Sequence, residues 1–189
     1  MEETMIEPIT SIDQLDPNGV YTYADYLTWK FEERVEIIKG KIFRMAAPAR
    51  RHQAISREVC NLLYRHFEGK PCEFYNAPFD VRLYNKRKSV RANKDIYSVI
   101  QPDVCIVCDL EKLDDKGCLG APDLIVEILS PGNSKKEMVN KRNLYEENGV
   151  REYWIIAPES EMLTQLVLQK NGNYAPPFRR NSYGAVFFQ

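Results

Sequence analysis

Apolar residues recur along the chain at two different spacings, and the wider spacing predicts two long helices. A spacing of three to four residues over 52–68 places an apolar stripe on one face of a helix that Gly69 would end. This stripe consists of Ile55, Val59, Leu62, Leu63 and Phe67. Ser134 and Glu137 have the spacing of a capping box, which predicts a second helix that ends at Gly149.

Shorter runs of β-branched and aromatic residues predict strands. Two such runs on either side of Lys39-Gly40 predict a hairpin over 35–45, and Thr22 with Asp25 predicts a short helix before it that runs to about residue 30. The other predicted strands cover 74–83, 99–108, 123–129, 152–157, 163–168 and 183–188. This order predicts an α/β protein: a mixed β-sheet core flanked by helices, with an N-terminal hairpin and C-terminal edge strands.

Length and charge restrict the class of protein. A chain of 189 residues fits one domain with a sizeable core. Its 26 basic and 27 acidic residues give a formal net charge of -1, which argues against a module that only coats nucleic acid but leaves room for an enzyme with a local basic groove. Since the chain has no apolar run of about 18 residues, and since 1–7 is acidic rather than signal-like, we expect a cytoplasmic protein without a membrane span.

Five scattered cysteines are typical of a reducing compartment. Cys105 and Cys108 form a C-x-x-C motif, but they lie in a predicted buried strand, where residues three apart point to opposite faces. We therefore expect buried free thiols rather than a zinc or redox site.

Two acids stand beside apolar strand sequences. Glu127 lies within a nearly continuous apolar run over 124–129, and Asp103 follows Pro102 at the start of another predicted strand. A buried carboxylate is costly unless it has a partner, and a divalent cation such as Mg²⁺ or Mn²⁺ suits carboxylate oxygens from two strands. A buried salt bridge, or an acid at a strand end, explains the same pattern equally well.

Lys141 is the candidate cation for the same site. It shares a helical face with Met138 and Tyr145, and its helix follows the Glu127 strand. If that face packs on the sheet, the ammonium reaches the acids and can orient a water molecule or neutralise a phosphate. The alternative is a solvated lysine that pairs with Glu137 or Glu146.

An ordered set of fragments resembles the Uma family of restriction endonucleases, a bacterial branch of the PD-(D/E)XK nuclease superfamily. The resemblance runs over about 22–158, which would be the core of a single nuclease-like domain. It rests on 36–42, 45–48 with His52, 101–103, 122–131, Lys141, Tyr145 and 149–156.

The resemblance implies a restriction-endonuclease-like core in which Asp103 and Glu127 hold Mg²⁺ or Mn²⁺. Leu129 occupies the position of the usual superfamily lysine, and Lys141 would replace that lysine from the next helix. Glu36 would be an additional acid of the metal site. An exposed hairpin charge is the alternative for Glu36, and loss of activity with the fold retained is the alternative for the whole site.

Three further residues match polar positions of the family and are candidates for substrate binding: His52, Gln101 and Tyr145. For His52, a capping or surface role at a helix N-terminus is the alternative. A basic segment could also contact phosphates, or could be a solvated hairpin tip. It contains Lys86, Arg87, Lys88, Arg91 and Lys94.

The leading hypothesis is therefore a metal-dependent endonuclease acting on DNA. A catalytically inactive module that binds nucleic acid or protein is the second hypothesis. The third is a homo-oligomer, most simply a homodimer, in which the C-terminal strands of two copies pair. Metal binding separates the first hypothesis from the other two.

Overall fold

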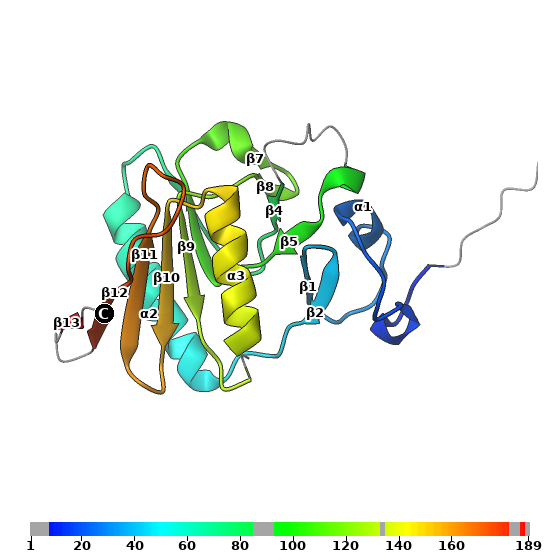
Figure 1. Ribbon diagram of the computed structural model, residues 1–189, viewed down its shortest axis with the longest axis horizontal. Coiled ribbons are helices and arrows are strands. Elements are labelled where there is room, and N and C mark those ends of the chain that lie inside the picture. Colours follow the sequence, from blue (N-terminus) through cyan, green and yellow to red (C-terminus); the bar gives the residue numbers. More distant parts are fainter. Residues whose placement is uncertain (1–7, 85–92, 133–134, 182–185, 188–189) are drawn as a thin grey trace, which may run out of the picture.

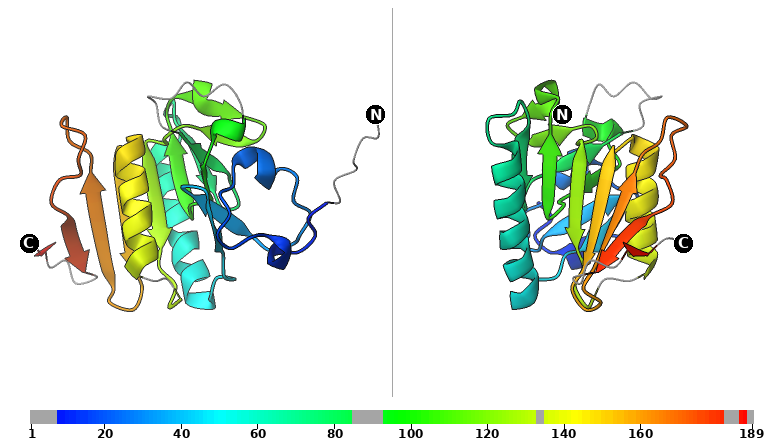
Figure 2. Two further views of the ribbon diagram at one scale, coloured as in Figure 1. Left: turned by 45° about the vertical axis from the view of Figure 1, so that its right-hand side comes forward. Right: turned by 90° about the vertical axis from the view of Figure 1, so that its left-hand side faces the viewer.

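The computed structural model describes residues 8–84, 93–132, 135–181 and 186–187, which form two β-sheets and two long helices (Figure 1). The helices α2 (Arg50–Phe67) and α3 (Lys135–Asn148) lie on opposite faces of the larger sheet (Figure 2). The predicted α/β class, with helices flanking a mixed β-sheet core, is confirmed. The prediction of a single sheet is wrong, because the described strands form one seven-stranded and one six-stranded sheet.

The seven-stranded sheet has the order β13-β12-β11-β10-β9-β6-β3. Its strands are β3 (Glu73–Asn76), β6 (Val104–Val107), β9 (Leu124–Ile128), β10 (Glu152–Ala157), β11 (Met162–Val167), β12 (Phe178–Asn181) and β13 (Val186–Phe187). β9 and β10 pair in parallel, and α3 forms the crossover between them. The other neighbouring strands are antiparallel.

The six-stranded sheet has the order β2-β1-β5-β4-β8-β7. Its strands are β1 (Val35–Ile38), β2 (Lys41–Arg44), β4 (Val81–Leu83), β5 (Ser98–Ile100), β7 (Leu113–Asp114) and β8 (Gly117–Leu119). The predicted hairpin is confirmed as β1 and β2. Lys39 and Gly40 both have positive φ, 50° and 81°, as a tight two-residue hairpin turn requires.

Two strand predictions are wrong, because each predicted strand is divided into two strands that belong to different sheets. The run 74–83 is divided between β3 and β4 by the cis peptide Ala77-Pro78. The run 99–108 is divided between β5 and β6 by Gln101-Pro102-Asp103. Proline has no N–H to donate to a ladder, so both strand pairs end beside it, and the second interruption brings Asp103 to the boundary between the sheets.

Two further expectations need correction. The helix α1 (Tyr23–Tyr26) is shorter than predicted, although Thr22 and Asp25 do form the reciprocal capping box. On α2, Leu63 is buried in the core, whereas Leu62 is 67% exposed and lies outside the apolar stripe. Three short 3-10 helices were not predicted: η1 (Ile12–Gln14), η2 (Asn93–Asp95) and η3 (Leu110–Lys112).

Cys105 and Cys108 point to opposite faces of the seven-stranded sheet, as predicted, since they pack into different core clusters. The prediction that Cys108 is a free thiol is wrong, because it forms a disulfide with Cys72. Glu73 of β3 pairs with Val107 of β6 in an antiparallel register. Cys72 and Cys108 occupy the next position along these two strands, so the pairing of β3 with β6 places them opposite each other. Cys60, Cys105 and Cys118 are free.

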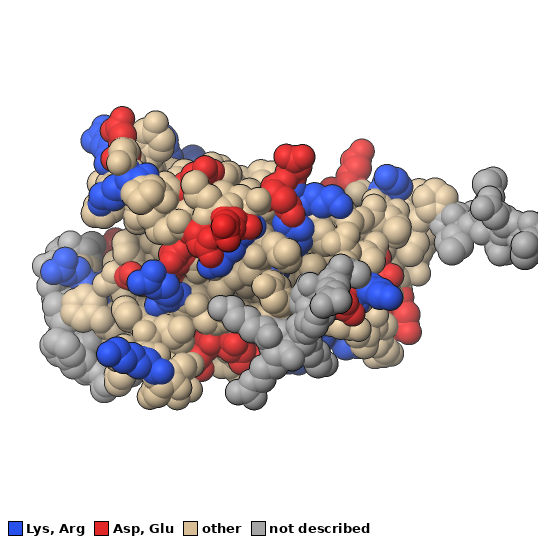
Figure 3. Space-filling view, turned by 90° about the horizontal axis from the view of Figure 1, so that it is seen from above, with Lys and Arg blue, Asp and Glu red and all other residues tan. Residues whose placement is uncertain are grey.

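Charges of both signs are interspersed on the face seen in Figure 3 and do not form one large basic surface there. Of the predicted basic segment, only Lys94 belongs to the described residues, where it is exposed in η2. Lys86, Arg87, Lys88 and Arg91 lie outside the described residues, as does the predicted cap Ser134. Within the described part of the chain, no helix is both long and apolar enough to cross a bilayer.

Candidate active site

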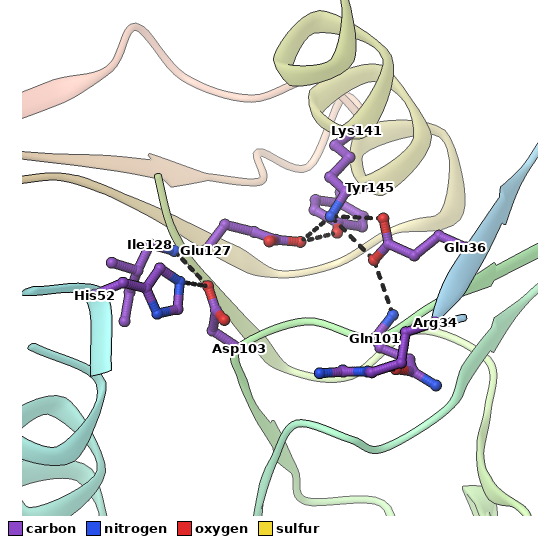
Figure 4. Close-up of polar contacts among 9 residues, drawn as sticks. All are labelled: Arg34, Glu36, His52, Gln101, Asp103, Glu127, Ile128, Lys141 and Tyr145. Carbon is purple, nitrogen blue, oxygen red and sulfur yellow. Dashed lines mark hydrogen bonds and ion pairs between the residues drawn. The ribbon is translucent and has the colours of Figure 1, made fainter. Parts of the chain in front are cut away.

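A cluster of charged side chains forms where the two sheets meet, close to the end of β9 (Figure 4). Glu36 comes from β1 of the six-stranded sheet, and Glu127 from β9 of the seven-stranded sheet. Asp103 precedes β6, and Lys141 and Tyr145 come from α3. The site therefore depends on both sheets and on the crossover helix that packs against them.

Asp103 and Glu127 are placed together by strand register. Val104 of β6 pairs with Val126 of β9 in an antiparallel ladder, so the next pair along the ladder would be Asp103 and Glu127. The backbone N–H of Ile128 donates to Oδ2 of Asp103 at 2.7 Å. This contact fixes the Asp103 carboxylate at the end of the neighbouring strand.

Glu127 accepts two hydrogen bonds from α3 on the same oxygen. Lys141 Nζ lies 3.0 Å from Oε1 of Glu127, and the hydroxyl of Tyr145 donates to that oxygen at 2.6 Å. Lys141 and Tyr145 are four residues apart, so they share the helical face that packs on the sheet. Lys141 is buried and pairs with acids of the cluster, whereas Glu146, one of the two alternative partners considered for a solvated lysine, pairs with Arg142.

Glu36 is buried, which excludes the exposed hairpin charge considered as an alternative. Only 3% of its side chain is exposed. Its Oε1 accepts the backbone N–H of Gln101 at 3.0 Å, and Lys141 Nζ lies 3.0 Å from the same oxygen and 2.9 Å from Oε2. The ammonium of Lys141 therefore bridges Glu36 and Glu127, and so joins the two sheets.

His52 is the third residue of α2 and faces Asp103 from the other side of the cluster. Its Nε2 lies 3.2 Å from Oδ2 of Asp103, and its Nδ1 is buried without a hydrogen-bond partner among the described residues. The hydrogen bond with Asp103 raises the pKa of His52, and burial opposes this shift. The imidazole is thus inside the site rather than on the surface as a helix cap.

Gln101 is held by its side chain as well as by its backbone. Its Oε1 accepts from Arg34 at 3.1 and 2.7 Å, and its Nε2 donates to Asp80 at 2.8 Å and to the Tyr26 hydroxyl at 3.3 Å. We did not predict a role for Arg34, Asp80 or Tyr26 from the sequence. Arg34 and Gln101 are 67 residues apart, and no local pattern indicates their contact.

Two carboxylates share the ammonium of Lys141 and a third, Asp103, lies nearby, and this excess of acids determines the electrostatics of the site. Burial raises the pKa of Glu127 to about 7; the nearby charge of Lys141 counteracts the shift, and those of Glu36 and Asp103 add to it. Burial alone would lower the pKa of Lys141, but the charges of Glu127 and Glu36 outweigh burial and raise it. The ammonium stays charged, while the surrounding acids carry an excess of negative charge that a further cation would offset.

Replacing Tyr145 by phenylalanine is expected to lower the free energy of unfolding by about 1.5–3 kcal/mol, because the change removes a buried hydrogen bond to a carboxylate. Urea unfolding measures the loss. Tyr64→Phe is the matched control, since Tyr64 is 60% exposed and its change should stay within about 0.5 kcal/mol. Equal losses in the two variants would show that the hydroxyl of Tyr145 does not stabilise the site.

The cluster borders a cavity of about 160 Å³. The predicted site residues that line it are Glu36, His52, Gln101, Asp103, Glu127 and Lys141, and Leu129 lines it as well. Among the described residues, no three His, Cys, Asp or Glu side chains form a compact cage for a metal ion. The donors still fit Mg²⁺ or Mn²⁺, because two carboxylates are a sufficient protein contribution for a hard cation that keeps several water ligands.

A second cavity, of about 700 Å³, lies beside α2 and has a different character. Its lining is mainly apolar and includes Leu63, Phe67 and Trp154. Of its two acids, Asp123 pairs with Arg151 at 3.0 Å, and Glu152 accepts the indole N–H of Trp154 at 2.6 Å. The described lining of the larger cavity therefore lacks the group of neighbouring acids that lines the smaller cavity.

Comparison with known proteins identifies the family. Residues 23–182 match the profile of the Uma2 family, described as "Putative restriction endonuclease". The chain belongs to the Uma2 family. The match covers all of the site residues described above, from Tyr26 to Tyr145, so the whole cluster lies within the part of the chain that matches the family.

Two individual proteins are similar to this Uma2 family member. The "Uncharacterized protein slr1290" of Synechocystis sp. is 27% identical over 139 residues, which cover 72% of this chain and 68% of that protein. The crystal structure of a "putative nuclease belonging to DUF820" from Anabaena variabilis superposes with a TM-score of 0.65 at 17% identity, over 86% of this chain and 85% of that one. At this identity the superposition establishes a shared fold.

Proposed function

We propose that this protein is an endonuclease that hydrolyses phosphodiester bonds in DNA with the help of Mg²⁺ or Mn²⁺. One observation carries the proposal: Asp103, directly before β6, and Glu127, on the adjacent strand β9, border the same cavity as the buried ammonium of Lys141. Membership of a family described as restriction endonucleases supports this choice among the reactions that such a cluster could perform.

In the proposed site Asp103 and Glu127 would hold the cation, and its chemistry when bound would be to polarise the phosphate and activate a water molecule. Lys141 lies beside Glu127 and can stabilise the negative charge that develops on the phosphate oxygens. A water oxygen forms a bond to phosphorus as the water gives up a proton to solvent, and the bond from phosphorus to the leaving sugar oxygen breaks as that oxygen takes a proton from solvent. Tyr145 orients Glu127, and His52 orients Asp103.

The direct test is cleavage of supercoiled plasmid and of linear DNA by the purified protein, with Mg²⁺, Mn²⁺ or a chelator. The proposal expects nicked or linear products with a cation and none with the chelator. Absence of products with either cation, across substrates of varied sequence, would contradict the endonuclease function.

Affinity for Mn²⁺ is expected to fall as the pH is lowered through about 7. Burial raises the pKa of Glu127 to about that value, and a proton on the carboxylate competes with a cation for the same oxygens. Titration calorimetry on either side of this pH measures the change. An affinity that does not depend on pH in this range would show that the cation does not use Glu127.

A further inference from the structure

Glu36 differs from the other acids of the site in how completely it is enclosed. Its side chain is 3% exposed, compared with 12% for Glu127 and 20% for Asp103. It also comes from the other sheet, on β1, whereas Glu127 and Asp103 belong to β9 and to the segment that leads into β6. An acid in this position can act on the site without touching a bound cation.

Both carboxylate oxygens of Glu36 are already engaged by the protein. Oε1 accepts the N–H of Gln101 and contacts Lys141, and Oε2 contacts Lys141 at 2.9 Å. An ammonium has three N–H donors, and Lys141 makes three contacts: two with Glu36 and one with Glu127. Two of the three ammonium contacts of Lys141 are therefore made with Glu36.

The carboxylate of Glu36 is itself fixed by a hydrogen bond from Gln101. The backbone N–H that it accepts belongs to Gln101, whose side chain is fixed by Arg34 and Asp80. Arg34, Gln101 and Glu36 thus form a continuous chain of hydrogen bonds that ends on Lys141. Figure 4 shows this arrangement, with Glu36 on one side of the ammonium and Glu127 on the other.

We propose that Glu36 is a positioning residue that holds Lys141 towards the six-stranded sheet, and that it is not a ligand of the cation. The inference rests on the proposed metal-dependent function. Without Glu36 the ammonium would have Glu127 as its remaining acidic partner and would pair with it fully. It would then compete with the cation for the carboxylate that the cation needs.

The alternative is that Glu36 is itself a metal ligand, and a double substitution separates the two roles. Glu36→Gln leaves Glu127 as the acid that still pairs with the ammonium of Lys141, whereas Glu36→Gln combined with Lys141→Met removes one negative and one positive charge together. The double variant therefore has the same net charge as the native cluster. A positioning role predicts that it recovers metal binding, and a ligand role predicts that it does not.

Calorimetry with Mn²⁺ on the native protein, the two single variants and the double variant tests the proposal. We expect Glu36→Gln to weaken binding by at least about tenfold, and the double variant to return to within about threefold of the native affinity, a clear coupling between the two sites. A double variant as weak as Glu36→Gln, or a Glu36→Gln variant with native affinity, would overturn the proposal. If Glu36→Gln does not fold, the comparison of the double variant with the native protein still decides.

A second measurement does not require the metal. The ¹H–¹⁵N signal of a buried, fully bonded lysine ammonium is protected from exchange with water, and it can be followed by NMR in the metal-free protein. We expect the chemical shift of this signal of Lys141 to change little in Glu127→Gln, which keeps both contacts with Glu36, and to change strongly in Glu36→Gln, where the ammonium turns to Glu127. The reverse pattern would overturn the positioning role. If the native protein binds no Mn²⁺, the metal-dependent function fails, while this signal still shows whether Glu36 holds Lys141.

Discussion

Replacing Lys141 by methionine is expected to lower the free energy of unfolding of the metal-free protein by about 3–5 kcal/mol, the usual cost of removing one partner from a buried ion pair. Lys141 is the ammonium that Glu36 and Glu127 share, and its loss leaves two buried acids beside Asp103 with no compensating cation. Urea unfolding in the presence of a chelator measures this loss.

The chain offers a matched control for this substitution. Lys39→Met breaks the ion pair with Glu147, in which both side chains are 55% exposed, and should change the free energy of unfolding by no more than about 1 kcal/mol. Mn²⁺ should restore part of the stability of Lys141→Met, because a bound cation offsets the same excess of negative charge. Equal effects of the two substitutions would contradict the shared role assigned to Lys141.

Replacing Asp103 by asparagine is expected to lower the rate of DNA cleavage by roughly 100-fold or more, the scale on which single electrostatic groups contribute to catalysis. Asparagine keeps an oxygen that can accept from the N–H of Ile128, so the strand end should remain in place. What it removes is the charge that would bind the cation. Initial rates of plasmid nicking at saturating Mn²⁺ measure the effect.

Asp123 provides the control, because it also follows a proline at the start of a strand. Its carboxylate accepts the N–H of Cys108 at 2.8 Å and pairs with Arg151, away from the cluster. Asp123→Asn is expected to cleave DNA at nearly the native rate. If the two asparagine variants lose activity equally, the effect comes from the fold and not from a metal site at Asp103.

The sequence indicated Glu127 for a physical reason, and Asp103 through the family resemblance. Glu127 lies within an apolar strand, where a buried carboxylate needs a hydrogen-bond or ion-pair partner. In the structure Lys141 and Tyr145 are these partners. The helical spacing of Lys141 and Tyr145 also indicated correctly that both would share a face. These inferences succeeded because each depends on one element and its immediate neighbour in the chain.

The parts of the site that could not be predicted depend on contacts between distant segments. The strands divide between the two sheets at Pro78 and Pro102. The hydrophobic pattern alone predicted one uninterrupted strand through each of these prolines. The disulfide of Cys72 with Cys108 and the contact of Arg34 with Gln101 depend on this division. Strand pairing over tens of residues has no local signature, so neither contact was visible in the sequence.

Titration calorimetry with Mn²⁺, on the native protein and on Glu127→Gln, tests the central claim most directly. Glutamine retains an oxygen for the hydrogen bonds from Lys141 and Tyr145 but removes the charge that would bind a cation. The account predicts one binding event in the native protein that is lost in the variant. Absence of binding to the native protein, or equal binding to both, would contradict a metal site built on Asp103 and Glu127.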